Sequence, residues 1–129
     1  MFVVQNGINF NKHYIEYMLI ETNNFQKLEN MLIKKNYKLA LKSFKFAALR
    51  EHPMSRLLLG NMYYQGQGIR KSYSRAFFWW KLAEDLNING AKQNINMLKN
   101  IMNNDQYLKG KEMYDLCMKN TLYNCTKKI

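Results

Sequence analysis

The sequence predicts an all-α fold, a short right-handed superhelix of stacked antiparallel helix pairs. The chain of 129 residues has one proline and six glycines, which argues against long loops. Its apolar residues recur at spacings of three and four, the period of a helix with one buried face. The same pattern returns at an interval in the mid-thirties, which is typical of stacked helical hairpins. No apolar run approaches the ~18 residues that a transmembrane helix needs.

We expect a single domain over residues 1–129. Within it, residues 1–36 form an N-terminal helical cap, residues 37–118 form the repeats with a C-terminal capping helix, and residues 119–129 form a tail. Pro53 separates two helices, because the residue before a proline avoids the α region and proline itself fits a first helical turn. The apolar spacing and the Asn-rich breaks predict helices over 12–22, 23–34, 36–52, 53–64, 73–86, 90–103 and 105–118.

The clearest hairpin lies between residues 59 and 83. Gly66 and Gly68 form its turn, because glycine takes a positive φ at little steric cost. Helices joined by so short a turn lie antiparallel and face each other. The adjacent Trp79 and Trp80 could offer a stacking platform for bases. The helical spacing instead predicts that Trp80 belongs to the core and that Trp79 packs between neighbouring hairpins.

One set of small and aromatic residues occurs three times along the chain. The second copy follows the first by 36 residues and the third follows the second by 34, and the two missing residues fall in the turn. The intervening helices keep the first offset, pairing Ser55 with Ala91 and Met62 with Leu98. The matched sets are Tyr37, Tyr73 and Tyr107; Ala40, Ala76 and Gly110; Phe44, Trp80 and Tyr114; and Ala47, Ala83 and Cys117.

The best-formed copy resembles a Sel1-like repeat. The positions that carry the resemblance are Leu59, Gly60, Tyr63, Gly66, Gly68, Ile69, Ala76, Trp79, Ala83 and Ala91. Ile69 stands where valine is usual, Ser72 where an aspartate commonly caps the second helix, and Glu84 where a second alanine is usual. The full pattern covers about a third of the chain, and half-patterns extend it from Tyr37 to Met118. The resemblance implies a fold related to tetratricopeptide repeats, a role in binding other proteins and no catalysis.

The residues offer no pattern for an active site, a metal or a cofactor. His13 and His52 belong to different predicted segments and have no cysteine or carboxylate at ligand spacing. We read His52 as a polar loop residue. The Gly66–Gly68 turn lacks the preceding strand and the Gly-Lys-Ser/Thr of a phosphate-binding loop. We therefore expect a chain that is not an enzyme.

The expected binding surface is the concave side of the stack. In such a stack the first helix of each pair lines that side, and its residues away from the apolar stripe face the groove. These residues are rich in amides and carry a few apolar groups, which suits recognition of backbone or polar side chains. They are Gln26, Asn30, Leu57, Asn61, Tyr64, Gln65, Gln93, Met97 and Asn100, with Ile101 beside them.

The formal net charge of +11 favours association with an acidic protein, nucleic acid or an anionic membrane surface and does not choose among them. For a protein partner it predicts an acidic contact surface. The excess of positive charge is concentrated in residues 37–72, which contain seven basic residues and one acidic residue, Glu51. We expect a protein partner, with the chain acting as an adaptor or as an immunity protein that neutralises a toxin. Nucleic-acid binding is the alternative, and a solvated lysine-rich surface is the plain interpretation. The basic residues are Lys38, Lys42, Lys45, Arg50, Arg56, Arg70 and Lys71.

Cys117 and Cys125 are the only cysteines. Their spacing allows a disulfide, but two cysteines in a chain of this length are more typical of reduced thiols in a cytosolic protein. The first residues lack a basic segment followed by a long apolar run, so they do not resemble a signal peptide. We expect a cytoplasmic protein.

Overall fold

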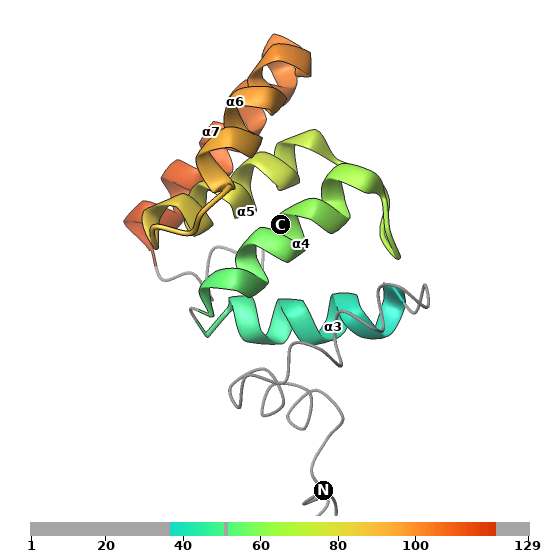
Figure 1. Cartoon of the computed structure of the whole chain (residues 1–129). Coiled ribbons are helices and arrows are strands. Elements are labelled where there is room, and N and C mark those ends of the chain that lie inside the picture. The colour runs from blue at the N-terminus through green and yellow to red at the C-terminus, as the bar shows by residue number, and fades with distance from the viewer. Residues whose placement is uncertain (1–36, 51, 121–129) are drawn as a thin grey trace, which may run out of the picture.

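The computed structural model describes residues 37–50 and 52–120, in which the regular elements are helices joined by turns and short loops (Figure 1). The predicted all-α fold is confirmed over this part of the chain. The predicted helices over 12–22 and 23–34, together with the cap that contains them and most of the tail, lie outside the described residues. The helices are α3 (Tyr37–Ala48), α4 (Pro53–Gln65), α5 (Tyr73–Asp85), α6 (Ala91–Ile101) and α7 (Asn104–Lys119).

Polar side chains cap the N-termini of three helices. Ser72 accepts a hydrogen bond from the backbone N–H of Arg75 and so caps α5, the role that aspartate commonly has at this position. Asn103 and Gln106 form a capping box at the start of α7. His52 caps α4 by accepting from the N–H of Ser55, and Pro53 occupies the first turn as predicted. His52 lies outside the helices, as predicted, and its ring nitrogen also satisfies a helix N–H.

The α4–α5 hairpin reverses as the glycines predict. Gly66 and Gly68 both have a φ of 71°, and the N–H of Gly66 bonds to the carbonyl of Met62. The N–H of Ser72 then donates to the carbonyl of Tyr63 at 2.9 Å, which ties the end of the turn to α4. These bonds fix the position of the residues between Gly68 and Ser72.

Helix α5 lies at the centre of the described residues, where it packs against α4, α6 and α7, while α3 packs against α4. Eight of its thirteen residues are buried, because neighbours cover it on several sides. Trp79 is 4% exposed and Trp80 is 1% exposed. The predicted core position of Trp80 is confirmed, and Trp79 is buried as well, so neither ring is available for stacking on bases.

Positions that match along the sequence are buried alike. Ala40, Ala76 and Gly110 are all buried, and so are Ala47, Ala83 and Cys117. The pairs between Ser55 and Ala91 and between Met62 and Leu98 are also buried. The third copy deviates at its aromatic position: Phe44 and Trp80 are buried, but Tyr114 is only half-buried.

Cys117 is in a disulfide, so the expectation of a reduced thiol at this position is wrong. It lies on the buried side of α7, where it is 4% exposed. The sequence holds one other cysteine, Cys125, which lies outside the described residues. Composition favoured free thiols, but pairing depends on where the fold places a sulfur atom, which composition does not encode.

Candidate partner-binding surface

Three of the predicted surface residues on α4 surround the indole of Trp80. The indole Nε1 donates to the carbonyl of Leu57 at 3.0 Å and to Oδ1 of Asn61 at 3.1 Å. The ring of Tyr64 lies 5.6 Å from that of Trp80, centroid to centroid. Leu57, Asn61 and Tyr64 are all half-buried. One side of each residue therefore supports the core, and the other side remains accessible.

Gly60 allows the tryptophan to approach α4 so closely. A Cβ atom at Gly60 would lie 2.4 Å from both Cδ1 and Nε1 of Trp80. Any side chain there would push the indole away from its two acceptors. The Leu-Gly pair of the repeat pattern thus has a direct physical role, since the glycine sets the spacing between α4 and α5.

The predicted residues on α6 are more exposed than those on α4. Gln93, Met97 and Asn100 follow each other at spacings of four and three, so they share one face of α6. Met97 is 41% exposed, and Ile101 at the end of the same helix is 47% exposed. Gln65, the last residue of α4, is exposed as well.

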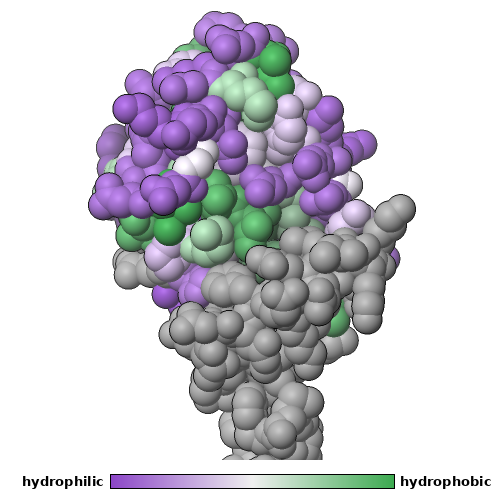
Figure 2. All heavy atoms as spheres, in the orientation of Figure 1, coloured by the Kyte–Doolittle hydropathy of each residue, from purple (hydrophilic) through white to green (hydrophobic). Residues whose placement is uncertain are grey.

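The predicted surface residues on α4 and those on α6 lie on helices that both neighbour α5. In Figure 1, α5 runs between α4 and α6, and it packs against both of them. Figure 2 shows polar residues over the end of the molecule where α6 and α7 lie, with an apolar band below them. Each set of predicted residues is therefore on a helix that contacts α5. Gln26 and Asn30 lie outside the described residues.

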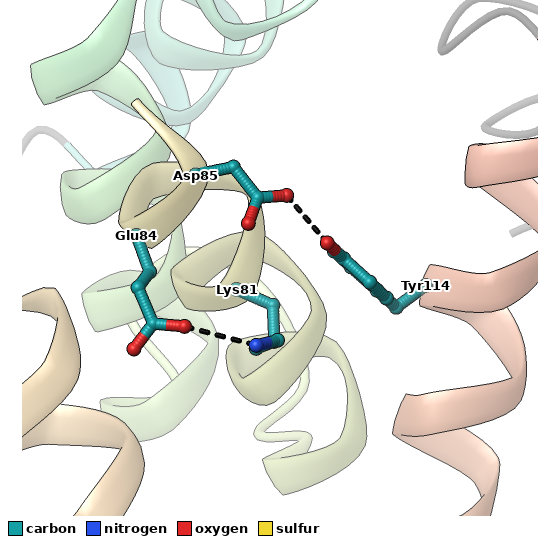
Figure 3. A network of polar contacts seen from close by, with 4 residues as sticks. All are labelled: Lys81, Glu84, Asp85 and Tyr114. Atoms are coloured by element: carbon teal, nitrogen blue, oxygen red, sulfur yellow. Dashed lines mark hydrogen bonds and ion pairs between the residues drawn. The ribbon is translucent and has the colours of Figure 1, made fainter. Parts of the chain in front are cut away.

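A small polar network joins the end of α5 to α7 (Figure 3). Lys81 Nζ lies 2.9 Å from Glu84 Oε1, and the hydroxyl of Tyr114 donates to Oδ2 of Asp85 at 2.6 Å. Burial, and then the hydrogen bond to Asp85, raise the pKa of Tyr114 to about 12. The Tyr114–Asp85 hydrogen bond links the two helices, and the tyrosine stays neutral at physiological pH.

The basic residues of the 37–72 segment divide into two kinds. Arg56 is 6% exposed, and its Nε donates to the carbonyl of Ala48 at 3.1 Å, so it ties the end of α3 to α4. Lys38, Lys42 and Lys45 are exposed along α3. The sequence contained a signal for the burial of Arg56, because it lies three residues before the buried Leu59 on the same helical face.

The part of the chain that the structure describes shows no group of His, Cys, Asp and Glu residues that could hold a metal ion. Within the same residues, no helix is both long enough and apolar enough to cross a membrane.

The comparison with protein families identifies one segment. The Sel1 repeat family matches residues 53–88, which comprise α4, the glycine turn, α5 and the residues just after it. No curated protein and no solved structure matches the chain. Sel1 repeats generally mediate protein–protein interactions and are typically non-catalytic. Residues 53–88, which contain the α4–α5 hairpin, are therefore similar to a Sel1 repeat.

Proposed function

We propose that this chain binds a protein partner through the exposed faces of α4 and α6. The observation that carries the proposal is the Sel1 repeat at residues 53–88, because such repeats generally mediate protein–protein interactions. Its first helix keeps polar and aromatic groups accessible at Asn61, Tyr64 and Gln65. The proposed surface comprises Gln26, Asn30, Leu57, Asn61, Tyr64, Gln65, Gln93, Met97 and Asn100.

The chemistry of this surface suits a polar segment of a partner. Side-chain amides both donate and accept hydrogen bonds, so they can recognise a peptide backbone as well as polar side chains. Met97 adds an adaptable apolar contact, since its thioether side chain has three rotatable bonds. Rigid positioning of Asn61 and Tyr64 by Trp80 lowers the entropy that these residues lose on binding.

We further propose that the partner presents an acidic surface and that the chain acts as an adaptor or as an immunity protein. The net charge of +11 supports an acidic partner by electrostatic steering. An immunity role is compatible with a small chain that blocks a toxin by covering it. Neutralisation of a basic nuclease is the least favoured version, because like charges would face each other across the interface.

The proposal is tested by capture of the partner with matched variants. Gln65→Ala, Gln93→Ala and Asn100→Ala together remove exposed amides from the proposed surface without touching the core. The control Lys109→Ala with Glu112→Ala changes exposed residues of α7 and keeps the net charge. We expect the triple variant to capture much less of a protein that the natural chain enriches, and the control to capture it unchanged. Equal capture by both variants would contradict the surface.

The compartment is a separate part of the proposal. The sequence favours the cytoplasm, but the disulfide at Cys117 counts against it, because disulfides are typical of oxidising compartments. Thiol labelling in denaturant immediately after cell lysis separates the two, because the 4% exposed Cys117 would be protected in the folded chain in either state. Labelled Cys117 supports the cytoplasm, and protected Cys117 supports an oxidising compartment.

Nucleic-acid binding remains the second candidate because Lys38, Lys42 and Lys45 form an exposed basic row on α3. It predicts binding of generic DNA or RNA that weakens steeply with salt, as phosphate contacts release counterions. A gel shift without any retarded band at low salt would exclude this candidate.

A further inference from the structure

A basic pocket lies where the glycine turn meets the start of α5. It has a volume of about 230 Å³ and receives residues from α3, from α4, from the turn and from the first turn of α5. All charged side chains among the described residues that line it are cations. The lining comprises Lys45, Tyr63, Ile69, Arg70, Lys71, Ser72 and Arg75.

The pocket is held in place by the hairpin itself. The bond from the N–H of Ser72 to the carbonyl of Tyr63 fixes the end of the turn that carries Arg70 and Lys71. The ammonium of Lys71 lies 4.8 Å from the centroid of the Tyr73 ring, a cation–π contact. Lys45 comes from a different helix, α3, so the cations converge on the pocket from separate parts of the fold.

Helix α5 adds to the positive potential. The pocket includes Ser72, the N-cap of α5, and the N-terminal end of a helix carries a partial positive charge. The first turn of α5 contains no acidic residue that would offset this charge. It contains Arg75 instead, so side chain and helix dipole act in the same direction.

Arg75 affects the pKa of two other groups that line the pocket. Burial, and then the positive charge of Arg75, lower the pKa of Lys45. Burial raises the pKa of Tyr63 despite the opposing effect of Arg75, so its hydroxyl is a neutral donor beside the cations. A carboxylate in the pocket would favour the charged form of Lys45 and could accept hydrogen bonds from the exposed guanidinium of Arg70.

A second pocket continues the first. It has a volume of about 300 Å³ and is lined by Lys71, Ser72, Tyr73, Ser74 and Gln106. Lys71 and Ser72 line both pockets, so the two pockets adjoin each other. The second pocket offers hydroxyl and amide groups, which suit the backbone of an extended chain.

We propose that this basic pocket binds carboxylate side chains of an extended acidic segment of the partner protein. The inference rests on the proposed function, because the Sel1 repeat points to a protein rather than to nucleic acid. It assigns the acidic part of the partner to the turn end of the α4–α5 hairpin. Nucleic acid is the competing occupant and is distinguished by the test.

The test measures the affinity of the full chain for a hexaglutamate peptide by calorimetry at fixed ionic strength. Arg70→Gln with Lys71→Gln removes two exposed cations of the pocket. Lys92→Gln with Lys109→Gln removes two exposed cations elsewhere, so the net charge stays matched. We expect the pocket variant to lose about tenfold in affinity and the control less than about threefold, since local contacts outweigh the general field.

Equal losses in the two variants would overturn the proposal, because the general charge would then explain the binding. Tighter binding of a random-sequence DNA duplex, with a larger loss in the pocket variant, would also overturn it in favour of nucleic acid. The variant Lys45→Gln provides a second check on a different helix, and thermal unfolding confirms that each variant is folded. The pocket variant could bind hexaglutamate as tightly as the natural chain while partner capture still depends on Gln65, Gln93 and Asn100. In that case this inference fails and the proposed function stands.

Discussion

Trp80 connects the core of this chain to its candidate surface. Its indole is 1% exposed, yet its Nε1 donates to two groups of α4 that border the surface. The geometry depends on Gly60, where even a methyl group would overlap the indole. A residue chosen for packing thus determines how Asn61 is presented to a partner.

The first prediction concerns Gly60→Ala. In an exposed helix this change would stabilise by about 1 kcal/mol. Here the new Cβ would lie 2.4 Å from Trp80, whose ring is fixed by two hydrogen bonds and by Tyr64. We expect the free energy of unfolding to fall by about 1–3 kcal/mol, as measured by urea unfolding. The exposed control Asn96→Ala should stay within about 0.5 kcal/mol of the natural chain. A stabilised Gly60→Ala variant would contradict the contact.

The second prediction concerns Tyr114, whose pKa is raised from 10.0 to about 12. Because the folded state disfavours the tyrosinate, the contribution to stability is complete below pH 10 and is lost as the pH rises towards 12. Asp85→Asn removes the acceptor charge, so the pKa of Tyr114 should fall. It should remain above 10, because burial is the larger cause.

An NMR titration of the tyrosine rings measures this pKa, with the Tyr114 signal assigned from its absence in Tyr114→Phe. The control Asp105→Asn changes an exposed carboxylate on the same helix as Tyr114 and should leave the value unchanged. An unchanged pKa in Asp85→Asn would mean that the hydrogen bond to Asp85 contributes nothing.

At the scale of elements, the α4–α5 hairpin depends on a turn in which two glycines have the same φ but different surroundings. At Gly66 the nearest atom to an added Cβ is Lys71 Cβ, at 3.3 Å. At Gly68 the added Cβ would lie 2.8 Å from Tyr37 Cβ and 2.9 Å from the carbonyl carbon of Tyr37. The second glycine therefore also sets how closely the turn approaches the start of α3.

The third prediction compares alanine at these two glycines. Gly66→Ala should cost roughly 1–2 kcal/mol, the strain of a left-handed conformation. Gly68→Ala should cost more, because the backbone of Tyr37 cannot move aside as a flexible side chain can. Paired urea unfolding curves give the difference directly. Equal destabilisation would mean that the contact with Tyr37 is unimportant.

The elements themselves were largely predictable. The 3.6-residue period, Pro53 and the glycine turn located α4 and α5 to within about a residue, because these local signals agree with the final packing. The end of α3 was harder to place, since Pro53 only limits how far a helix can extend. Ala48 is its last residue, and its carbonyl is satisfied by Arg56 from the next helix, a contact that no local pattern encodes.

For the whole molecule, the repeat register was predictable but the details of the surface were not. Equivalent small residues in the three copies are buried, because close packing of helices requires small groups at fixed intervals. The helical period correctly separated exposed Gln93 and Met97 from the buried Ile95 and Leu98. It could not show that Asn61 and Tyr64 contact Trp80, since these contacts depend on how α4 and α5 face each other.

The basic pocket illustrates the same limit. Lys45, Arg70 and Arg75 lie 30 residues apart at most, and only the fold brings α3, the turn and α5 together. The sequence showed an excess of positive charge in residues 37–72, but it did not show that several of these cations line one pocket. Net charge describes a general field, whereas a site requires geometry.

We propose that exposed residues of α4 and α6 bind a protein partner. The most direct measurement introduces a photo-crosslinking residue at Gln65 or Gln93 and, in parallel, at Lys109 on α7, all exposed positions. After irradiation in the native cell, we expect one partner to be crosslinked from Gln65 and Gln93 and not from Lys109. Crosslinking from Lys109 alone, or equally from all three positions, would contradict the claim.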